Sequence, residues 1–416
     1  MTISFKNKSP LFYIAIASVI ICVAIQIGIQ VIHGDAPQIS DCDVHLSLAM
    51  SAFDQGQFYP TAGNIYDQYL LAPAFINFLV LQLHLFGTMA FNWVFNLLFS
   101  ILITYEIFWL AKRFFDPTTG FLSVIAYSML YSTWTCVYPS ATEVPFLALG
   151  LSSLCLALKG GIWRLLIAGS LLALANSVRP LAILFFIAII TAMIYRRAKV
   201  GEYISTLIGI SAIVCLIGCY VQSRTGYFKH TSTTGGLNML IKANDKATGA
   251  LPPQYDDQYT DMRLDLEKGM DYVHTDRARQ KRAIDWILNN PGRWSILYLK
   301  GIPIMYFHDA SFDGYFEENV GYIKTIENNQ SFKDKVIERI PKSLVYYIVM
   351  LLFLTALWLR RRQILTPPGI LLIVPVLGTL ATCCFQTMAR YHYPFMPFFI
   401  IWGCSALPLL FPKTLR

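Results

Sequence analysis

The sequence predicts an all-α polytopic membrane protein with about ten transmembrane helices, juxtamembrane helices and a lid region at the outer face. Three observations lead to this prediction. The chain is 55% hydrophobic and only 14% charged, whereas a soluble domain carries roughly 25% charged residues. Its mean hydropathy is +0.50. Several apolar runs also reach the roughly 20 residues that a helix needs to cross a bilayer.

Basic residues recur at the ends of the apolar runs and indicate the orientation. They are Lys6 and Lys8, Lys112 and Arg113, Lys159 and Arg164, Arg196, Arg197 and Lys199, Arg360, Arg361 and Arg362, and Lys413 and Arg416. The positive-inside rule places these clusters, and with them both termini, in the cytoplasm. This distribution also explains the formal net charge of +8, so we expect a lipid bilayer and no nucleic acid as a partner.

The first span is expected at Leu11–Ile32, which lacks a small-residue cleavage site and should therefore be retained. Between Lys8 and Lys112 the number of crossings must be even, yet three apolar stretches compete there. The shortest, Leu70–Phe86, carries a proline and several polar residues, so we expect it to pack at the outer face without crossing. Thr88–Ala111 then provides the second crossing.

The remaining spans are expected to follow in alternating directions. They are Phe121–Tyr138, Val144–Leu158, Ile162–Val178, Leu181–Tyr195, Tyr203–Gln222, Leu344–Leu359, Pro368–Phe385 and Pro394–Phe411. The chain thus divides into an N-terminal membrane module (1–222) with its first outer loop at 33–70, a periplasmic or luminal region (223–342) and C-terminal membrane helices (343–416). Within the outer region, Asp276–Trp294 is expected to form an interfacial helix.

Ionisable side chains fall at outer turns that are far apart in sequence. They are Asp41 and Asp43 after the first span, Glu143 between two spans, Arg179 before Pro180, and Arg390 with Tyr391 before the last span. Charged residues at membrane depth are costly unless they face water, a partner or a substrate. Their expected convergence on one face predicts a functional cavity there.

Each of these residues also has a plainer explanation. An aspartate at a span end is usually only solvated, Glu143 could simply begin the next helix, and Arg179 could reach lipid headgroups. If the segment after the first span is helical, His45 shares the face of Asp41 because it follows four residues later, while Asp43 points elsewhere.

The outer region adds a stretch rich in glycine and asparagine. Gly235 and Gly236 allow a backbone to approach a ligand closely, and Lys242 and Asn244 could bind anionic or sugar oxygens. Nine cysteines with no framework spacing do not indicate a disulfide scaffold. No metal-ligand spacing is present; an aspartate pair could hold Mg²⁺ or Mn²⁺, but no metal is assigned.

Taken in order, these residues resemble the GT-C glycosyltransferases, and more closely the protein mannosyltransferase and lipid A aminoarabinose transferase branch, glycosyltransferase family 39. The residues that carry the resemblance are Asp41 with His45 and Ala49 four and eight positions on, Thr142-Glu143, Arg179-Pro180, Asn244 with Thr248-Gly249, and Arg390-Tyr391 with Pro394. The resemblance covers nearly the whole chain. It departs at His45, where the branch usually has tyrosine, and at Asp41-Cys42-Asp43, which replaces a frequent Asp-Glu pair.

The resemblance implies an inverting glycosyltransferase of the cell inner membrane. It would move a hexosyl or pentosyl group from a polyprenyl-phosphate-linked donor to a glycan, lipid or protein acceptor on the periplasmic face. Either aspartate could be the general base, and the register favours Asp41. The implied site also has Glu143 orienting a substrate, and Arg179, Arg390, Lys242, His45, Tyr391 and Asn244 binding the donor phosphate or sugar.

Two other classes of protein fit part of the pattern. A transporter or flippase of a lipid-linked or polar solute would also keep charged residues in an outward cavity, but such proteins often contain internal repeats, and none is found here. A polysaccharide polymerase or ligase would share the donor type and a large outer loop, but would favour loops rich in arginine and histidine over an aspartate after the first span.

Overall fold

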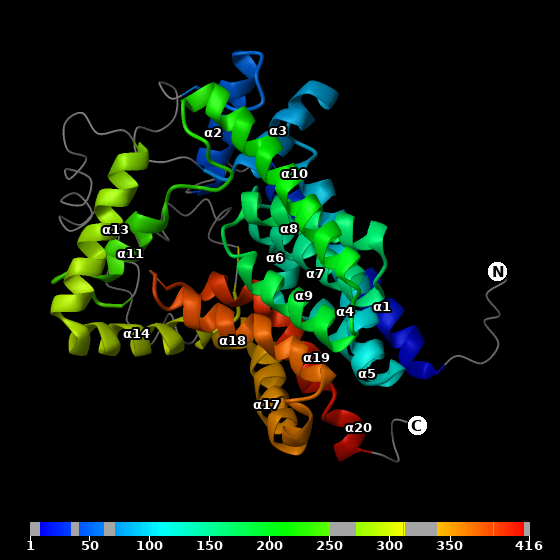
Figure 1. The fold of residues 1–416 in the computed structure, drawn as a ribbon. Helices are drawn as coiled ribbons and strands as arrows, with labels where there is room; N and C mark the ends of the chain where they lie inside the picture. Colours follow the sequence, from blue (N-terminus) through cyan, green and yellow to red (C-terminus); the bar gives the residue numbers. More distant parts are fainter. Residues whose placement is uncertain are drawn as a thin grey trace.

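The computed structural model describes residues 9–34, 41–61, 71–249, 272–310, 312, 339–385 and 387–411. The regular elements of these residues are helices, and no β-strand is found among them (Figure 1). Parts of the expected first outer loop (35–40 and 62–70), the basic residues Lys6, Lys8, Lys413 and Arg416, and much of the outer region lie outside the described residues.

The N-terminal half alternates long and short helices. They are α1 (Pro10–His33), α2 (Asp41–Asp54), α3 (Pro73–Phe86), α4 (Asn92–Phe114), α5 (Pro117–Ser128), α6 (Tyr131–Thr135), α7 (Glu143–Lys159), α8 (Ile162–Val178), α9 (Ile183–Tyr195) and α10 (Val200–Thr225). The outer region contributes α11 (Gly235–Lys242), α13 (Tyr272–Asn289) and α14 (Pro291–Tyr306). The C-terminal part contains α17 (Leu344–Leu359), η3 (Arg361–Gln363), η4 (Pro367–Gly369), α18 (Ile370–Thr382), η5 (Ala389–Phe395), α19 (Met396–Cys404) and α20 (Leu407–Leu410).

Four described helical segments are long and apolar enough to cross a membrane: Pro10–His33, Asn92–Phe114, Val200–Thr225 and Ala389–Leu410. The chain is therefore an all-α membrane protein. Several further apolar helices, such as α8 and α17, are shorter than the roughly 20 residues of a straight span. The expected boundaries of α8 and α17 agree with the structure, while the total of ten crossings remains a prediction.

The last long helical segment lies at the centre and the first at the edge. Of the most apolar stretch of Ala389–Leu410, 78% is buried, against 17% for Pro10–His33. Every residue of α19 is buried, and the aromatic rings of Trp402 and Phe398 belong to the main core. Because η5 directly precedes the buried helix α19, the side chains of η5 lie near the middle of the bundle.

Two sequence predictions about helix limits are wrong. The expected span Phe121–Tyr138 is broken between α5 and α6, where Leu130 is extended and the buried Asp309 carboxylate accepts a hydrogen bond of 2.9 Å from Ser132 N. The expected helix Asp276–Trp294 is two helices, because Pro291 has no backbone N–H and begins α14 after the break at Asn290.

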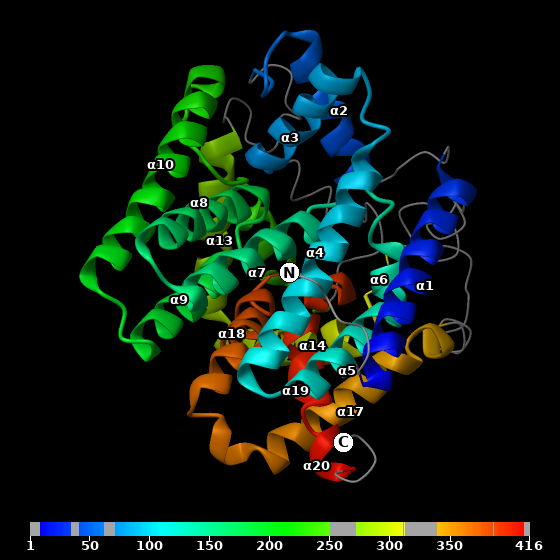
Figure 2. The same cartoon turned by 90° about the vertical axis from the view of Figure 1, so that its right-hand side faces the viewer.

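The helices α2 and α3 lie at one end of the molecule and α20 at the other (Figures 1 and 2). At 14 residues, α3 is too short to span a bilayer in an upright orientation. Its Phe75, Ile76 and Leu79 side chains are buried in the main core, and Phe75 packs edge-on against His45 of α2 at 5.2 Å between ring centroids. This packing fixes the helix that carries Asp41.

The helices α11 and α13, in the part of the chain expected to lie outside the membrane, form a small unit with a core of its own. Leu237, Leu240 and Ile241 of α11 pack against Ala283 of α13, with the Trp286 ring beside them. Figure 1 shows α11, α13 and α14 together to the left of the main bundle. The outer region of the chain therefore contains a folded helical unit rather than an extended loop alone.

Candidate active site

Four segments that are far apart in the sequence bring charged side chains together beside η5, the helix that precedes α19. Asp41 is the first residue of α2, and Glu143 is the first residue of α7, where the helix dipole favours a carboxylate. Arg179 ends α8 in an extended conformation, as expected for a residue that precedes a proline. Arg390 lies in the 3₁₀ helix η5. The convergence expected from the sequence is thus observed for these four residues.

The four side chains form a continuous ion-pair network. Arg390 Nη2 donates to Asp41 Oδ2 at 2.5 Å, and Arg390 Nε lies 3.9 Å from Glu143 Oε1. Arg179 Nη1 donates to the same Glu143 oxygen at 2.6 Å. Glu143 is therefore paired with both arginines, while Asp41 forms its ion pair with Arg390.

Exposure separates the two carboxylates. The side chain of Glu143 is 2% exposed, whereas that of Asp41 is 57% exposed. Partial burial raises the pKa of Asp41, but the charge and hydrogen bond of Arg390 outweigh this effect and lower the pKa below its ordinary value. Asp41 is therefore ionised at neutral pH and accessible to a molecule arriving from solvent, while Glu143 is enclosed.

The aromatic ring of Tyr391 orders the two guanidinium groups. Arg179 lies 5.1 Å and Arg390 lies 5.6 Å from the centre of this ring, within the range of cation–π attraction. Arg179 Nη1 also donates to Thr142 Oγ1 at 3.3 Å. Both cations are thereby held at one place, where together they could bind a doubly charged oxyanion.

His45 lies on the buried face of α2 and supports the site from there. Its side chain is buried, and its Nδ1 lies 3.3 Å from the carbonyl oxygen of Ser140, in the turn that precedes Glu143. Burial lowers the pKa of His45, and the nearby Asp41 carboxylate opposes this only in part. The imidazole is consequently neutral at neutral pH and connects α2 to the turn before α7.

Sequence reasoning missed the residues that hold this turn. Asn96 Nδ2 donates to the carbonyl oxygens of Val137 and Pro139, each at 3.0 Å. Asn92 Nδ2 donates to Ser140 Oγ at 3.1 Å. Two asparagines on one face of the mostly apolar first half of α4 are themselves a signal, because a buried amide in a membrane helix requires a partner.

Three predicted site residues do not join the network. Asp43 follows Asp41 by two residues, about 200° further around α2, and is exposed. Lys242 donates from Nζ to Thr387 Oγ1 at 2.9 Å. Asn244 caps the C-terminus of α11 by donating from Nδ2 to the carbonyl oxygens of Leu240 and Ile241.

The aspartates of α2 do not form a chelating pair. Asp41 and Asp43 point to different sides of the helix, and Asp41 is already bonded to Arg390. Among the described residues, no three histidine, cysteine, aspartate or glutamate side chains gather where they could hold a metal ion.

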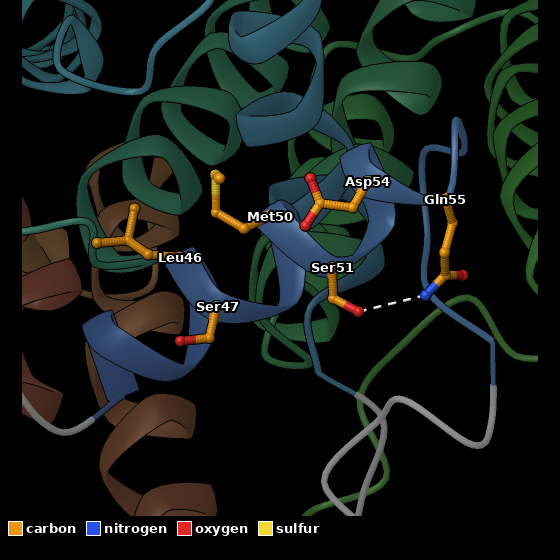
Figure 3. Close-up of a pocket in the computed structure, with 6 residues that line it drawn as sticks. All are labelled: Leu46, Ser47, Met50, Ser51, Asp54 and Gln55. Carbon is orange, nitrogen blue, oxygen red and sulfur yellow. Dashed lines mark hydrogen bonds between the residues drawn. The ribbon is translucent and has the colours of Figure 1, made fainter.

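A shallow depression lies along the surface of α2. Its lining residues, shown in Figure 3, are Leu46, Ser47, Met50, Ser51, Asp54 and Gln55. Gln55 Nε2 donates to Ser51 Oγ at 3.2 Å within this surface. Most of these residues lie on other sides of α2 than Asp41. The depression is therefore separate from the ion-pair network.

The fold has a counterpart among solved structures. The chain is similar to the apo crystal structure of an oligosaccharyltransferase from Archaeoglobus fulgidus, with a TM-score of 0.52 and 12% identity, covering 96% of this chain and 51% of that chain. It is also similar to ArnT from Cupriavidus metallidurans bound to undecaprenyl phosphate, with a TM-score of 0.43 and 10% identity, covering 95% and 78%. No protein-family model and no curated protein matches the sequence.

This chain spans about half the length of the archaeal oligosaccharyltransferase, 51% of it. At 12% identity, the likeness concerns the arrangement of helices and not the chemistry. The chain thus shares its helical fold with this oligosaccharyltransferase, in agreement with the fold that the sequence resemblance implied.

Proposed function

We propose that the protein is an inverting glycosyltransferase that moves a sugar from a polyprenyl-phosphate-linked donor to a hydroxyl of a glycan, lipid or protein. The observation that carries this proposal is an accessible carboxylate, Asp41, held beside two guanidinium groups that share one tyrosine ring. A carboxylate that can take a proton and paired cations that can receive a phosphate are what such a transfer requires. The archaeal protein that shares the fold is an oligosaccharyltransferase.

In the proposed reaction, Asp41 removes the proton of the acceptor hydroxyl. The acceptor oxygen forms a bond to the anomeric carbon on the face opposite the phosphate, and the bond from that carbon to the phosphate oxygen breaks. The electron pair stays with the polyprenyl phosphate, whose added charge is met by Arg179 and Arg390. Inversion follows from the single displacement.

The ion pair between Asp41 and Arg390 gives this reaction an order. An arriving phosphate competes with the Asp41 carboxylate for the Arg390 guanidinium, to which Asp41 is bonded at 2.5 Å. When the guanidinium turns to the phosphate, Asp41 loses the contact that lowers its pKa and becomes a stronger base. Donor binding therefore precedes activation of the acceptor, while Glu143 continues to hold Arg179 at 2.6 Å.

The test is a transfer assay with the full-length protein in liposomes. The donor carries a radiolabelled sugar on a fluorescent polyprenyl phosphate, and an envelope extract from the source organism supplies acceptors. We expect free polyprenyl phosphate to appear in equal amount with the glycosylated product. Movement of the intact lipid-linked sugar between leaflets, with its bond to phosphate unbroken, would instead establish a flippase.

The proposal places the site on the periplasmic side of the inner membrane, with both termini in the cytoplasm and about ten crossings. It is supported by the position of α2 at the end of the molecule opposite α20 (Figures 1 and 2). With the exposed Cys215 and Cys219 replaced, we expect Thr61→Cys to react with a membrane-impermeant maleimide in intact cells.

The matched control is Thr366→Cys, an exposed position in the connection after Arg360–Arg362. It should react only after the membrane is permeabilised. Labelling of the Thr366 variant in intact cells, with the Thr61 variant protected, would reverse the orientation and place the site in the cytoplasm.

A further inference from the structure

The segment that carries Arg390 is held on both sides by helices of the outer region. Three residues before Arg390, Thr387 Oγ1 accepts a hydrogen bond of 2.9 Å from Lys242 Nζ at the end of α11. Two residues after it, His392 Nδ1 lies 2.6 Å from the carbonyl oxygen of Met305 in α14. We refer to Thr387–Tyr393 as the Arg390 segment.

The contact of Lys242 is enclosed by three parts of the chain. The Lys242 side chain is 1% exposed, and a lysine is almost never fully buried unless its ammonium group has a partner. Gly301 of α14 passes directly over the bond: a Cβ atom there would lie 2.6 Å from Lys242 Nζ and 2.8 Å from Thr387 Oγ1. Glycine at this position thus allows α11, α14 and the Arg390 segment to meet at one buried hydrogen bond.

The contact of His392 is equally enclosed. Its side chain is fully buried, and its ring stacks on Tyr306 of α14 at 5.5 Å and lies 5.1 Å from the ring of Tyr346 in α17. Tyr346 OH donates to the carbonyl oxygen of Tyr306 at 2.9 Å. The histidine is therefore fixed to the C-terminal end of α14 by both stacking and hydrogen bonding.

We infer that Lys242 and His392 are positioning residues, through which α11 and α14 set the place of the Arg390 guanidinium relative to Asp41. Because α11 and α13 share a core of their own, a displacement of this unit acts on Thr387 through a buried bond rather than through loose surface contacts. The helices α11, α13 and α14 then control whether Arg390 pairs with Asp41 or turns toward a phosphate. This inference rests on the proposed function for its catalytic meaning.

The first measurement is independent of any activity. In hydrogen exchange of the full-length protein in nanodiscs, we expect Lys242→Met to accelerate exchange across the Arg390 segment by about tenfold, the effect of losing one buried hydrogen bond to a charged group. Tyr298→Phe is the matched control, because it removes a bond of 3.0 Å between α14 and the Leu380 carbonyl without touching this segment. Equal exchange in the wild type and Lys242→Met would overturn the inference.

The second measurement separates positioning from direct donor binding. Lys242→Met should raise the KM for the donor about tenfold and change kcat little, and it should add nothing further in an Arg390→Lys background. Additive losses in the double variant, with exchange unchanged, would mean that Lys242 binds the phosphate itself. An absence of transfer in the wild type would overturn the proposed function, while the exchange result would still decide the positioning.

A further variant covers the case in which Lys242→Met does not fold. Thr387→Val combined with Lys242→Met replaces both partners of the bond with apolar groups and leaves neither the ammonium nor the hydroxyl buried without the other, so it should fold better than either single variant. Its exchange across the Arg390 segment should match that of Lys242→Met. Wild-type exchange in this double variant would equally overturn the inference.

Discussion

Replacing Asp41 with asparagine is expected to reduce sugar transfer by about 10²–10⁴-fold, the usual contribution of a general base. Asparagine has nearly the same shape but cannot take the proton of the acceptor hydroxyl. Because the Asp41 side chain is 57% exposed and Arg390 stays beside Glu143, loss of the ion pair with Asp41 should cost less stability than loss of the enclosed Glu143 carboxylate. The measurement is initial-rate transfer in liposomes, together with the midpoint of thermal unfolding.

Asp43→Asn is the matched control. Asp43 is also exposed and lies on the same helix, but it points to another side of α2. We expect it to retain nearly full activity. If Asp43→Asn is inactive and Asp41→Asn is active, the general base is Asp43, and the contact between Asp41 and Arg390 is structural.

Replacing Glu143 with glutamine is expected to affect both stability and activity. Its enclosed carboxylate holds Arg179 at 2.6 Å and lies 3.9 Å from Arg390, and each arginine side chain is at most 15% exposed. Removing one partner from a buried ion pair typically costs about 3–5 kcal/mol, because the remaining charges stay desolvated. The unfolding midpoint should fall, and transfer should drop at least about tenfold as the arginines lose their common anchor.

Glu202→Gln separates the two effects. Glu202 pairs with Arg196 at 3.0 Å and accepts backbone hydrogen bonds from Gly161 and Lys199, at the opposite end of α8 from Arg179. This variant should also lower the unfolding midpoint, but the folded fraction should keep its kcat. If Glu143→Gln lowers activity no more than Glu202→Gln does at equal stability, Glu143 has only a structural role.

The sequence was sufficient to predict a helical membrane protein because hydropathy is a local property, while the expected ten crossings stay a prediction. The expected limits of α8 and α17 match the structure, and those of α1 differ by one residue at each end. Where a polar contact from a distant segment intervenes, the prediction failed. At the break between α5 and α6, the Ser132 amide donates a hydrogen bond to the carboxylate of Asp309, which is 177 residues away in the sequence.

The candidate site was predicted in part. Acids and arginines at the outer turns were expected to converge, because membrane depth makes each of them costly alone. Asp41, Glu143, Arg179 and Arg390 do meet. Lys242 has the charge expected of a phosphate ligand, but its contact is with Thr387, and no local pattern in α11 indicates this partner.

By itself, the sequence predicted that the chain is helical, that it lies in a membrane and that its acids and arginines at four distant turns come together. The tertiary structure alone decided which carboxylate is enclosed and which is open. Asp41 and Arg390 are 349 residues apart, so their pairing is set by the packing of α2 and α3 against the bundle and by the burial of α19. Pairing of this kind depends on side-chain packing across the whole chain, whereas spans and turns depend on the hydrophobicity of neighbouring residues.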